Sequence, residues 1–330
     1  MKILLTGSAG FIGFHTAKML LERGDTVVGF DNFNEYYDPK LKDARNEVLE
    51  GYDNFSIIRG DLKSIDALKS AFDIIGGGKD TRVCHLAAQA GVRHSIENPD
   101  EFIQDNIQGT NNIFELCKEY NVGGVTYASS SSIYGDNEQS PFKEEHKSDK
   151  PMSLYGMTKK CNELQAYTYY SLHGVKSTGL RIFTVYGPYG RPDMALFLFT
   201  DWIVNNKPMQ IFGEGKMQRD FTYVEDIASG IVAALDKNYD YEVFNLGGGK
   251  TEELMTYIST LEQALGKVGQ KEMLPMQPGD VVSTSADISK AQKMLGYDPK
   301  THISEGIPKF VKWYKEYYEV ENGKRKTENL

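Results

Sequence analysis

Tyr155 and Lys159 have the residue types and the spacing for proton transfer. They occupy positions i and i+4 of Tyr155-Gly156-Met157-Thr158-Lys159, so a helix through this segment places a phenol and an ammonium on one face. A free tyrosine has a pKa near 10, and a nearby positive charge lowers it by favouring the phenolate. The pair therefore predicts a general base for a substrate hydroxyl.

A serine cluster precedes Tyr155 by about 25 residues. The run Val125–Ala128 predicts a strand, and Ser129-Ser130-Ser131-Ser132 follows it directly. Ligands bind beyond the carboxyl ends of strands in an open parallel sheet, so these hydroxyls are expected beside the substrate. Ser130 or Ser131 can share the reacting oxygen with Tyr155 and stabilise or relay its proton.

A glycine turn at the start of the chain predicts a dinucleotide site. The run Lys2–Thr6 predicts a buried strand, Gly7-Ser8-Ala9-Gly10-Phe11-Ile12-Gly13 follows, and a helical pattern comes next. Gly7 permits a tight turn, Gly10 lets the backbone approach a phosphate, and Gly13 allows close helix–strand packing. The amides at the helix N-terminus favour a pyrophosphate.

Asp31 indicates which dinucleotide this turn would bind. It follows the predicted strand Thr26–Phe30 directly. A carboxylate at that position accepts both adenosine ribose hydroxyls and repels a 2′-phosphate, which favours NAD over NADP. The alternative is an ordinary strand–helix turn in which Asp31 serves as a cap.

Strands and helices alternate through the first half of the chain. Further strands are predicted at residues 55–59, 82–86, 125–128 and 179–183. This alternation predicts an α/β fold, with a doubly wound parallel Rossmann sheet and a smaller C-terminal α/β substrate domain. We expect residues 1–180 to form the NAD-binding domain, residues 220–248 to return to it, and residues 181–330 to form mainly the substrate domain.

Two residues near the strand ends have alternative roles. Asp61 could accept a hydrogen bond from an adenine amine or cap the helix that begins near Ser64. His85 is interpreted as a hydrogen-bonded core histidine rather than a catalytic one. The small residues after it, Ala87 and Ala88, would let a flat cofactor lie against the backbone.

Two long helices are predicted beyond these strands. Residues 99–120 form one, with an apolar stripe of Ile103, Ile107, Phe114 and Cys117. Met157–His173 forms the other and is apolar on more than one face. Such a helix needs more than one packing partner, which favours a homodimer with paired helices over complete burial within one chain.

The composition excludes several classes of protein. The chain has 330 residues and a net charge of −9, without a basic run long enough to follow nucleic acid. It opens directly into a strand pattern and holds no apolar stretch of about 18 residues, so we expect no signal peptide and no membrane span. Three scattered cysteines predict a reduced, cytoplasmic protein, and six histidines without ligand spacing predict no metal site.

Together these motifs resemble the extended short-chain dehydrogenases/reductases, and among them the nucleotide-sugar 4-epimerases. In that family the tyrosine matching Tyr155 takes the proton of the sugar 4-hydroxyl while a hydride passes from C4 to NAD, and the hydride returns after the 4-keto sugar has turned over. The resemblance implies that NAD is held by Gly7, Ala9, Gly10, Phe11, Ile12, Gly13, Asp31, Asn32, Asp61, Leu62, Leu86, Ala87, Ala88, Gln89, Tyr155 and Lys159.

Three segments resemble the UDP-glucuronate 4-epimerase subgroup more closely: Asp31–Asp38, Ala88–Arg93 and Gly190–Met194. A glucuronate carboxylate needs a counter-charge, which the Arg191 guanidinium can supply bidentately. The alternative is that Arg191 only braces its loop. The resemblance implies substrate contacts from Arg93, Ser130, Ser131, Ser132, Tyr155, Thr184 and Arg191, with Arg219 on the diphosphate and Asp280 on the uridine ribose.

Ser132 bears on the fate of the 4-keto sugar. Related decarboxylases and dehydratases carry a glutamate where this chain has Ser132, the last residue of Ser130-Ser131-Ser132. A serine cannot act as that acid, which favours simple return of the hydride. The expected reaction is the conversion of UDP-glucuronate to UDP-galacturonate, a plausible supply for acidic polysaccharides.

Three alternatives remain open from the sequence. One is a 4-epimerase of UDP-glucose and UDP-galactose or of an N-acetylated UDP-uronic acid. Another is a non-catalytic NAD-binding protein that keeps the fold. The third is a net oxidoreductase that releases NADH.

Overall fold

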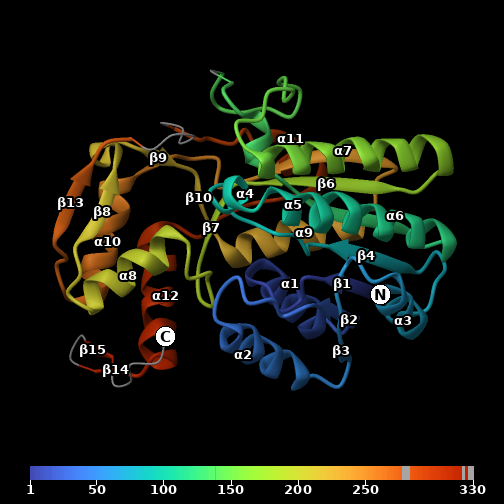
Figure 1. Cartoon of the computed structure of the whole chain (residues 1–330), viewed down its shortest axis with the longest axis horizontal. Helices are drawn as coiled ribbons and strands as arrows, with labels where there is room; N and C mark the ends of the chain where they lie inside the picture. Colours follow the sequence, from blue (N-terminus) through green and yellow to red (C-terminus); the bar gives the residue numbers. More distant parts are fainter. Residues whose placement is uncertain (138, 277–282, 322–323, 326–330) are drawn as a thin grey trace.

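A seven-stranded sheet lies at the centre of the computed structural model, which describes residues 1–137, 139–276, 283–321 and 324–325 (Figure 1). Every neighbouring pair of strands in it is parallel. Its order is β3-β2-β1-β4-β5-β6-β11. The strands are β1 (Lys2–Thr6), β2 (Thr26–Asp31), β3 (Phe55–Arg59), β4 (Thr81–His85), β5 (Gly124–Ser130), β6 (Ser177–Ile182) and β11 (Tyr241–Leu246).

The strand order reverses direction at β1. The chain adds β2 and β3 on one side of β1, then crosses to β4 on the other side, where Lys2 lies opposite both Thr26 and Thr81. A crevice forms beyond the carboxyl ends of the strands at such a switch point. The predicted doubly wound Rossmann sheet is confirmed.

Helices cover both faces of this sheet (Figure 1). One layer contains α1, α2, α9 and α11, and the other contains α3, α6 and α7. The first layer is α1 (Phe11–Glu22), α2 (Pro39–Glu50), α9 (Val224–Lys237) and α11 (Ser289–Leu295). The second layer is α3 (Ile65–Ile75), α6 (Gly109–Glu119) and α7 (Leu154–His173). The short helices α4 (His94–Glu97) and α5 (Pro99–Phe102) and the π-helix η1 (Ile103–Gln108) precede α6 in the chain.

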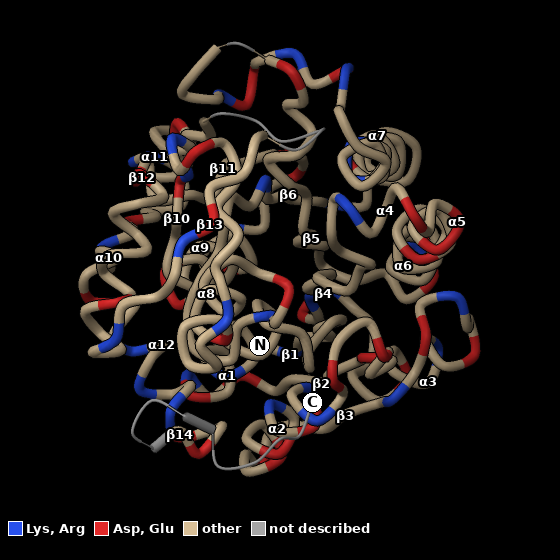
Figure 2. The backbone as a smooth tube through the Cα atoms, turned by 60° about the vertical axis from the view of Figure 1, so that its left-hand side comes forward, with Lys and Arg blue, Asp and Glu red and all other residues tan. Residues whose placement is uncertain are grey.

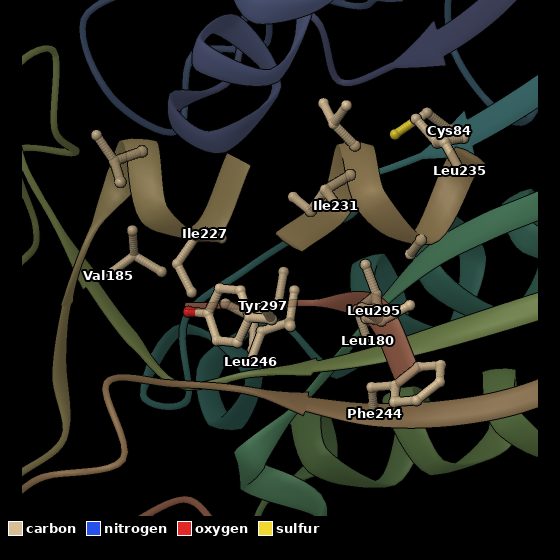
Figure 3. Close-up of a cluster of buried hydrophobic side chains, with 14 of the residues drawn as sticks. Cys84, Leu180, Val185, Ile227, Ile231, Leu235, Phe244, Leu246, Leu295 and Tyr297 are labelled. Carbon is tan, nitrogen blue, oxygen red and sulfur yellow. The ribbon is translucent and has the colours of Figure 1, made fainter. Parts of the chain in front are cut away.

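The core beneath α9 shows how the sheet and helix are joined. Ile227, Ile231 and Leu235 project from α9 toward Leu180 of β6 and Leu246 of β11 (Figure 3). These five side chains are almost completely buried. Burying each one contributes about 1.5–3 kcal/mol, so this contact fixes β11 at the edge of the sheet.

A second, smaller unit packs beside the carboxyl ends of the strands (Figure 1). It has its own cluster of buried apolar residues, largely from α8, α10 and α12. Its helices are α8 (Ala195–Val204), α10 (Leu254–Leu265) and α12 (Ile303–Tyr317), and the short 3-10 turn η3 (Gly213–Gly215) belongs to it as well. A second 3-10 turn, η2 (Ser131–Tyr134), directly follows β5. Four strand pairs complete the structure: β7 (Thr184–Tyr186) with β10 (Phe221–Tyr223), β8 (Met209–Phe212) with β13 (Lys271–Leu274), β9 (Gln218–Arg219) with β12 (Glu252–Glu253), and β14 (Val320–Glu321) with β15 (Lys324–Arg325).

The predicted helix over residues 99–120 is interrupted by the π-helix η1. A π turn is wider than an α turn, so it rotates the following side chains out of the simple helical register. Phe114 and Cys117 are buried as predicted, but Ile103 is exposed and Ile107 only half-buried. The single apolar stripe through these four residues was therefore wrong.

Charges of both signs are interspersed along the chain (Figure 2). Within the described residues, no helix combines the length and the apolar character required to cross a bilayer.

Candidate functional site

A cavity of about 440 Å³ lies at the carboxyl edge of the central sheet. Its walls come from the segments that follow β1, β2, β3, β4, β5 and β6, together with the first turns of α1 and α7. Most of the predicted site residues line this cavity: Gly7, Gly10, Phe11, Ile12, Gly13, Asp31, Asn32, Asp61, Leu62, Leu86, Ala87, Ala88, Gln89, Ser130, Ser131, Ser132, Tyr155, Lys159, Thr184 and Arg191.

The glycine turn after β1 is a cradle that side chains would fill. Gly7 has φ +77°, and a Cβ there would lie 2.7 Å from the backbone nitrogen of Ala87. A Cβ on Gly13 would lie 1.9 Å from the carbonyl oxygen of Gly7. The turn is therefore closed against both β4 and α1, with the first amides of α1 at the cavity. That arrangement suits a pyrophosphate.

Asp31 is the last residue of β2 and is buried beside this turn. Its carboxylate accepts hydrogen bonds from the amides of Ala9 at 3.1 Å and Phe33 at 2.9 Å. Burial raises the pKa of Asp31, while the Phe33 amide and the charge of Lys42 act in the opposite direction. The carboxylate both fixes the turn and borders the cavity.

The capping alternative for Asp61 is wrong. Ser64 is the N-cap of α3, and its hydroxyl accepts the Ala67 amide. Asp61 instead accepts from the amide of Lys63 at 2.8 Å and from the side chain of Asn32 at 3.2 Å. Its carboxylate therefore stands at the cavity wall next to Asn32.

His85 is a core residue, as predicted. Its ring is hydrogen-bonded to Thr6 at 2.7 Å and to Thr110 at 3.0 Å. Burial lowers its pKa to about 3, so the ring is neutral. The Thr6 hydroxyl also accepts the Ala87 amide, which fixes the start of the loop after β4.

Tyr155 and Lys159 project from the first turns of α7, which begins at Leu154 because the Ser153 hydroxyl accepts the Gly156 amide. The Lys159 ammonium donates to the carbonyl oxygen of Ala128 at 2.9 Å. Burial lowers the pKa of Lys159 to about 8. The ammonium is thereby tied to the end of β5.

Burial has the largest effect on the pKa of Tyr155. Burial raises it above the usual tyrosine value, whereas a hydrogen bond with Ser130 and the charge of Arg191 act to lower it. Desolvation outweighs both influences. The lowering expected from the Lys159 ammonium together with a positively charged nicotinamide stays a prediction.

The first serine of the cluster is hydrogen-bonded to a buried ion pair. Arg181 of β6 donates to the Glu163 carboxylate of α7 through Nε at 2.8 Å and Nη2 at 2.9 Å. Ser129 donates to the same carboxylate at 2.8 Å. Ser130, the next residue, accepts the Ser132 amide at 3.1 Å and contacts Tyr155. The geometry thus favours Ser130 over Ser131 as the partner of the phenol.

Arg191 and Thr184 line the cavity on the side of the smaller unit. The Arg191 guanidinium is paired with Asp193, with Nε donating to Oδ1 at 3.0 Å. Arg191 thus does brace its own loop through Asp193. Because it also lies at the cavity wall, it can contact a bound ligand as well.

Three predicted residues do not line the cavity, and a fourth is not among the described residues. Ala9 is fully buried, since its amide donates to Asp31 and its carbonyl accepts from Arg45, so it does not line the cavity. Arg93 lies over the Phe212 ring, and Arg219 lies in β9, where it donates to Met217 and Gln218. Asp280 lies outside the described residues.

The sequence reasoning missed several residues that line the cavity. Asn34, Tyr36 and Tyr37 come from the segment after β2, Lys42 comes from α2, and Asp193 and Met194 follow Arg191. Lys42 is buried and donates to the side chain of Asn34 at 2.6 Å, and burial lowers its pKa to about 8. Except for Lys42, these residues belong to the segments Asp31–Asp38 and Gly190–Met194, whose resemblance to the subgroup was the available signal.

No cluster of three or more histidine, cysteine, aspartate or glutamate side chains suited to a metal ion occurs within the described ranges.

The chain belongs to the NAD dependent epimerase/dehydratase family, whose model matches residues 3–247. The resemblance on which the sequence analysis relied is confirmed.

Individual relatives cover nearly the full chain. An uncharacterized protein of Methanocaldococcus jannaschii is 48% identical over 319 residues, which are 95% of this chain and 96% of the relative. A probable UDP-glucuronate 4-epimerase of Rhizobium meliloti is 43% identical over 337 residues, 96% and 98% of the two chains. The crystal structure of UDP-glucuronic acid 4-epimerase from Bacillus cereus, in complex with UDP-glucuronic acid and NAD, superposes with a TM-score of 0.90 at 37% identity and covers 96% of this chain and 100% of that one.

Proposed function

We propose that the protein is an NAD-dependent epimerase that interconverts UDP-glucuronate and UDP-galacturonate at C4 through a transient 4-keto sugar. The observation that carries this proposal is that the glycine turn, Tyr155 and Arg191 border one cavity. The turn that would hold the dinucleotide and the two side chains that would meet the sugar thereby border the same space. The names of the Rhizobium and Bacillus relatives support the same substrate.

The residues at the turn fit NAD. The missing side chains at Gly7 and Gly13 leave the backbone amides open to a pyrophosphate, and Asp31 stands where a ribose would offer two hydroxyls. When bound, NAD supplies the acceptor and then the donor of a hydride. The chain's own part is to hold the dinucleotide with its reactive face toward the cavity.

Proton transfer is assigned to Tyr155. Its phenol oxygen would take the proton of the sugar 4-hydroxyl as the hydride leaves C4 and would return it when the hydride comes back. The pKa of Tyr155 is raised by burial, so the positive charge of a bound nicotinamide and the Ser130 hydroxyl are the groups that would favour phenolate. Lys159 would fix the end of β5, where Ser130 lies, through the Ala128 carbonyl.

The sugar would lie between the serine cluster and the smaller unit. Arg191 and Thr184 would hold the C6 carboxylate, while Ser130, Ser131 and Ser132 face the ring. Arg93, Arg219 and Asp280 are assigned to the UDP moiety only through family resemblance. Ser132 offers no acid at the cavity, so return of the hydride is favoured over loss of CO2 or water.

The test is incubation of the purified protein with UDP-glucuronate, without added cofactor, followed by NMR of the sugar. Appearance of UDP-galacturonate without CO2 is the expected result, because NAD would remain bound from one turnover to the next. Turnover of UDP-glucose but not of UDP-glucuronate would overturn the assignment of the carboxylate site. No turnover of any UDP-sugar, even after addition of NAD, would overturn the epimerase proposal.

We also propose a homodimer that pairs α7 of two copies. Leu164, Tyr167 and Leu172 of this helix expose 58%, 53% and 70% of their surfaces. Three large apolar side chains on one helix favour a protein partner. The double variant Leu164→Glu, Leu172→Glu is expected to be a monomer in light scattering. The control Val268→Glu, at an exposed valine of the smaller unit, is expected to remain a dimer. A monomeric parent protein would contradict this proposal.

The division of labour and the compartment are proposals as well. Residues 1–180, joined by 220–248, would bind NAD, and the rest of 181–330 would bind the UDP-sugar. The three cysteines, Cys84, Cys117 and Cys161, form no disulfide, which supports a reducing, cytoplasmic setting.

A further inference from the structure

Asp193 holds one edge of the Arg191 guanidinium. Nε donates to Oδ1 at 3.0 Å, and Nη2 donates to Oδ2 of the same carboxylate. A guanidinium has five N–H donors in a rigid plane, so this bidentate contact fixes the direction of the remaining ones. The Tyr36 hydroxyl also shares a hydrogen bond with this guanidinium, and Arg191 borders the cavity.

Asp193 is itself fixed from the cofactor side of the cavity. The Tyr36 hydroxyl donates to its Oδ2 at 3.0 Å, and the Arg191 guanidinium lies 5.7 Å from the centre of the Tyr36 ring. Tyr36 belongs to the segment between β2 and α2, five residues after Asp31. The direction of Arg191 therefore depends on two loops that are far apart in the sequence.

A third loop holds Tyr36 in place. Its ring packs against His94 with a centroid distance of 4.6 Å. Gly91 has φ +115°, and a Cβ there would lie 2.7 Å from the Tyr36 hydroxyl oxygen, so only glycine leaves space for this phenol. Tyr36 is thus confined between the loop after β4 and the Asp193 carboxylate.

The pair is ionised around neutral pH. Burial acts to raise the pKa of Asp193, but the charge and hydrogen bonds of Arg191, with the Tyr36 hydroxyl, bring it below the usual value. Burial and the Asp193 charge raise the pKa of Tyr36 to about 12, so the phenol stays a donor. The three groups form one fixed array of donors and acceptors.

We infer that Asp193, supported by Tyr36, is a positioning residue that presents the Nη1 edge of Arg191 to the C6 carboxylate of the sugar and so sets the preference for acidic over neutral substrates. This inference rests on the proposed function. Without Asp193 the long arginine side chain would have to be ordered by the substrate, at a cost in rotamer entropy. In this role Asp193 acts on the sugar through Arg191.

The test compares two ligands that differ only in the carboxylate. UDP-xylose is UDP-glucuronate without its C6 carboxylate, so the ratio of their dissociation constants isolates that group. The constants are measured by calorimetry on the NAD-loaded enzyme, for the parent protein, Asp193→Asn, Tyr36→Phe and Arg191→Gln. Asp43→Asn is the matched control, because Asp43 also pairs with an arginine, Arg59 at 2.7 Å, on the surface outside the cavity.

Asp193→Asn is expected to weaken the binding of UDP-glucuronate about tenfold, which is the effect of losing one charge-assisted hydrogen bond. The dissociation constant of UDP-xylose is expected to change by less than about twofold. Tyr36→Phe is expected to act in the same direction but less. Equal weakening of both ligands would indicate a merely structural role and overturn the inference. Tighter binding of UDP-glucuronate would also overturn it, since Asp193 would then mask Arg191.

Arg191→Gln separates this inference from the proposal beneath it. If Arg191→Gln lowers the preference for UDP-glucuronate and Asp193→Asn does not, the positioning role fails and the carboxylate site stands. If neither variant changes the ratio, the assignment of the carboxylate to Arg191 fails. The ratio of kcat/KM for the two sugars in Asp193→Asn gives an independent measurement, because a general loss of folding lowers both values equally.

Discussion

Asn106 binds the backbone of Gln89 from both sides: its Oδ1 accepts the Gln89 amide at 2.7 Å, and its Nδ2 donates to the Gln89 carbonyl oxygen at 3.0 Å. The same Nδ2 donates to Thr158 of α7 at 3.1 Å. Asn106 lies in the π-helix η1, and π turns often occur at functional sites. One side chain thus joins the loop after β4 to the helix that carries Tyr155.

Replacing Asn106 with alanine is expected to loosen this side of the cavity. Asn106→Ala leaves two buried backbone groups of Gln89 without partners, at a cost of about 1–3 kcal/mol each. We expect a lower midpoint of thermal unfolding and weaker NAD binding, measured by calorimetry. Asn111→Ala is the control, since Asn111 bonds Tyr169 in α7 away from the cavity. Unchanged NAD affinity in Asn106→Ala would contradict the role of this contact.

Tyr155→Phe is expected to reduce turnover of UDP-glucuronate by about 10²–10⁴-fold, the usual contribution of a general base. Binding of UDP-glucuronate should change little, because only one hydroxyl is lost. Tyr170→Phe, on the same helix, tests for nonspecific effects, since this ring packs against Tyr241 outside the cavity. Equal activity of the two variants would exclude Tyr155 as the proton acceptor.

The pH profile of kcat/KM distinguishes the role of Ser130. Its hydrogen bond lowers the pKa of Tyr155, so the phenolate forms at lower pH when Ser130 is present. Ser130→Ala should therefore move the acidic limb to higher pH, by about half to one unit for a hydrogen bond of ordinary strength. Ser171→Ala, on the exposed side of α7, should leave the limb in place. A shift to lower pH would have the wrong sign for this contact.

Asp31→Asn is expected to weaken the binding of NAD about tenfold and to reduce the preference for NAD over NADP. A neutral amide accepts ribose hydroxyls less strongly and no longer repels a 2′-phosphate. Asp25 provides a matched control at the opposite end of β2, where it pairs with Arg23 at 2.6 Å. Asp25→Asn should lower stability without changing the ratio of the two dissociation constants; if both variants change it equally, Asp31 is not the specificity residue.

Gly13→Ala is expected to prevent NAD retention because its Cβ would lie 1.9 Å from the Gly7 carbonyl oxygen. The turn and α1 would have to separate, so thermal stability should fall as well. Gly51 has φ −69°, and its Cβ would meet only the Val48 carbonyl oxygen at 3.3 Å. Gly51→Ala should therefore keep both stability and bound NAD. Full NAD content in purified Gly13→Ala would refute the cradle.

Local patterns were sufficient for much of the fold. The predicted strands Lys2–Thr6 and Phe55–Arg59 match β1 and β3, because short apolar runs bounded by glycine or aspartate turns are typical of strands. The helix after the glycine turn was also located correctly as α1. Residues 99–120 were predicted less well, since a π turn has no local sequence signature and shifts every later side chain.

By itself, the sequence determined the alternation of strands and helices along the chain, the glycine turn, and the placement of Tyr155 and Lys159 on one helix. Each of these features depends on residues that are close together in the sequence. Only the tertiary structure decided that burial outweighs the effect of nearby charge on the pKa of Tyr155. It alone brought Tyr36 to Asp193, 157 positions away. Desolvation and long-range hydrogen bonds depend on how distant segments pack, which no local pattern encodes.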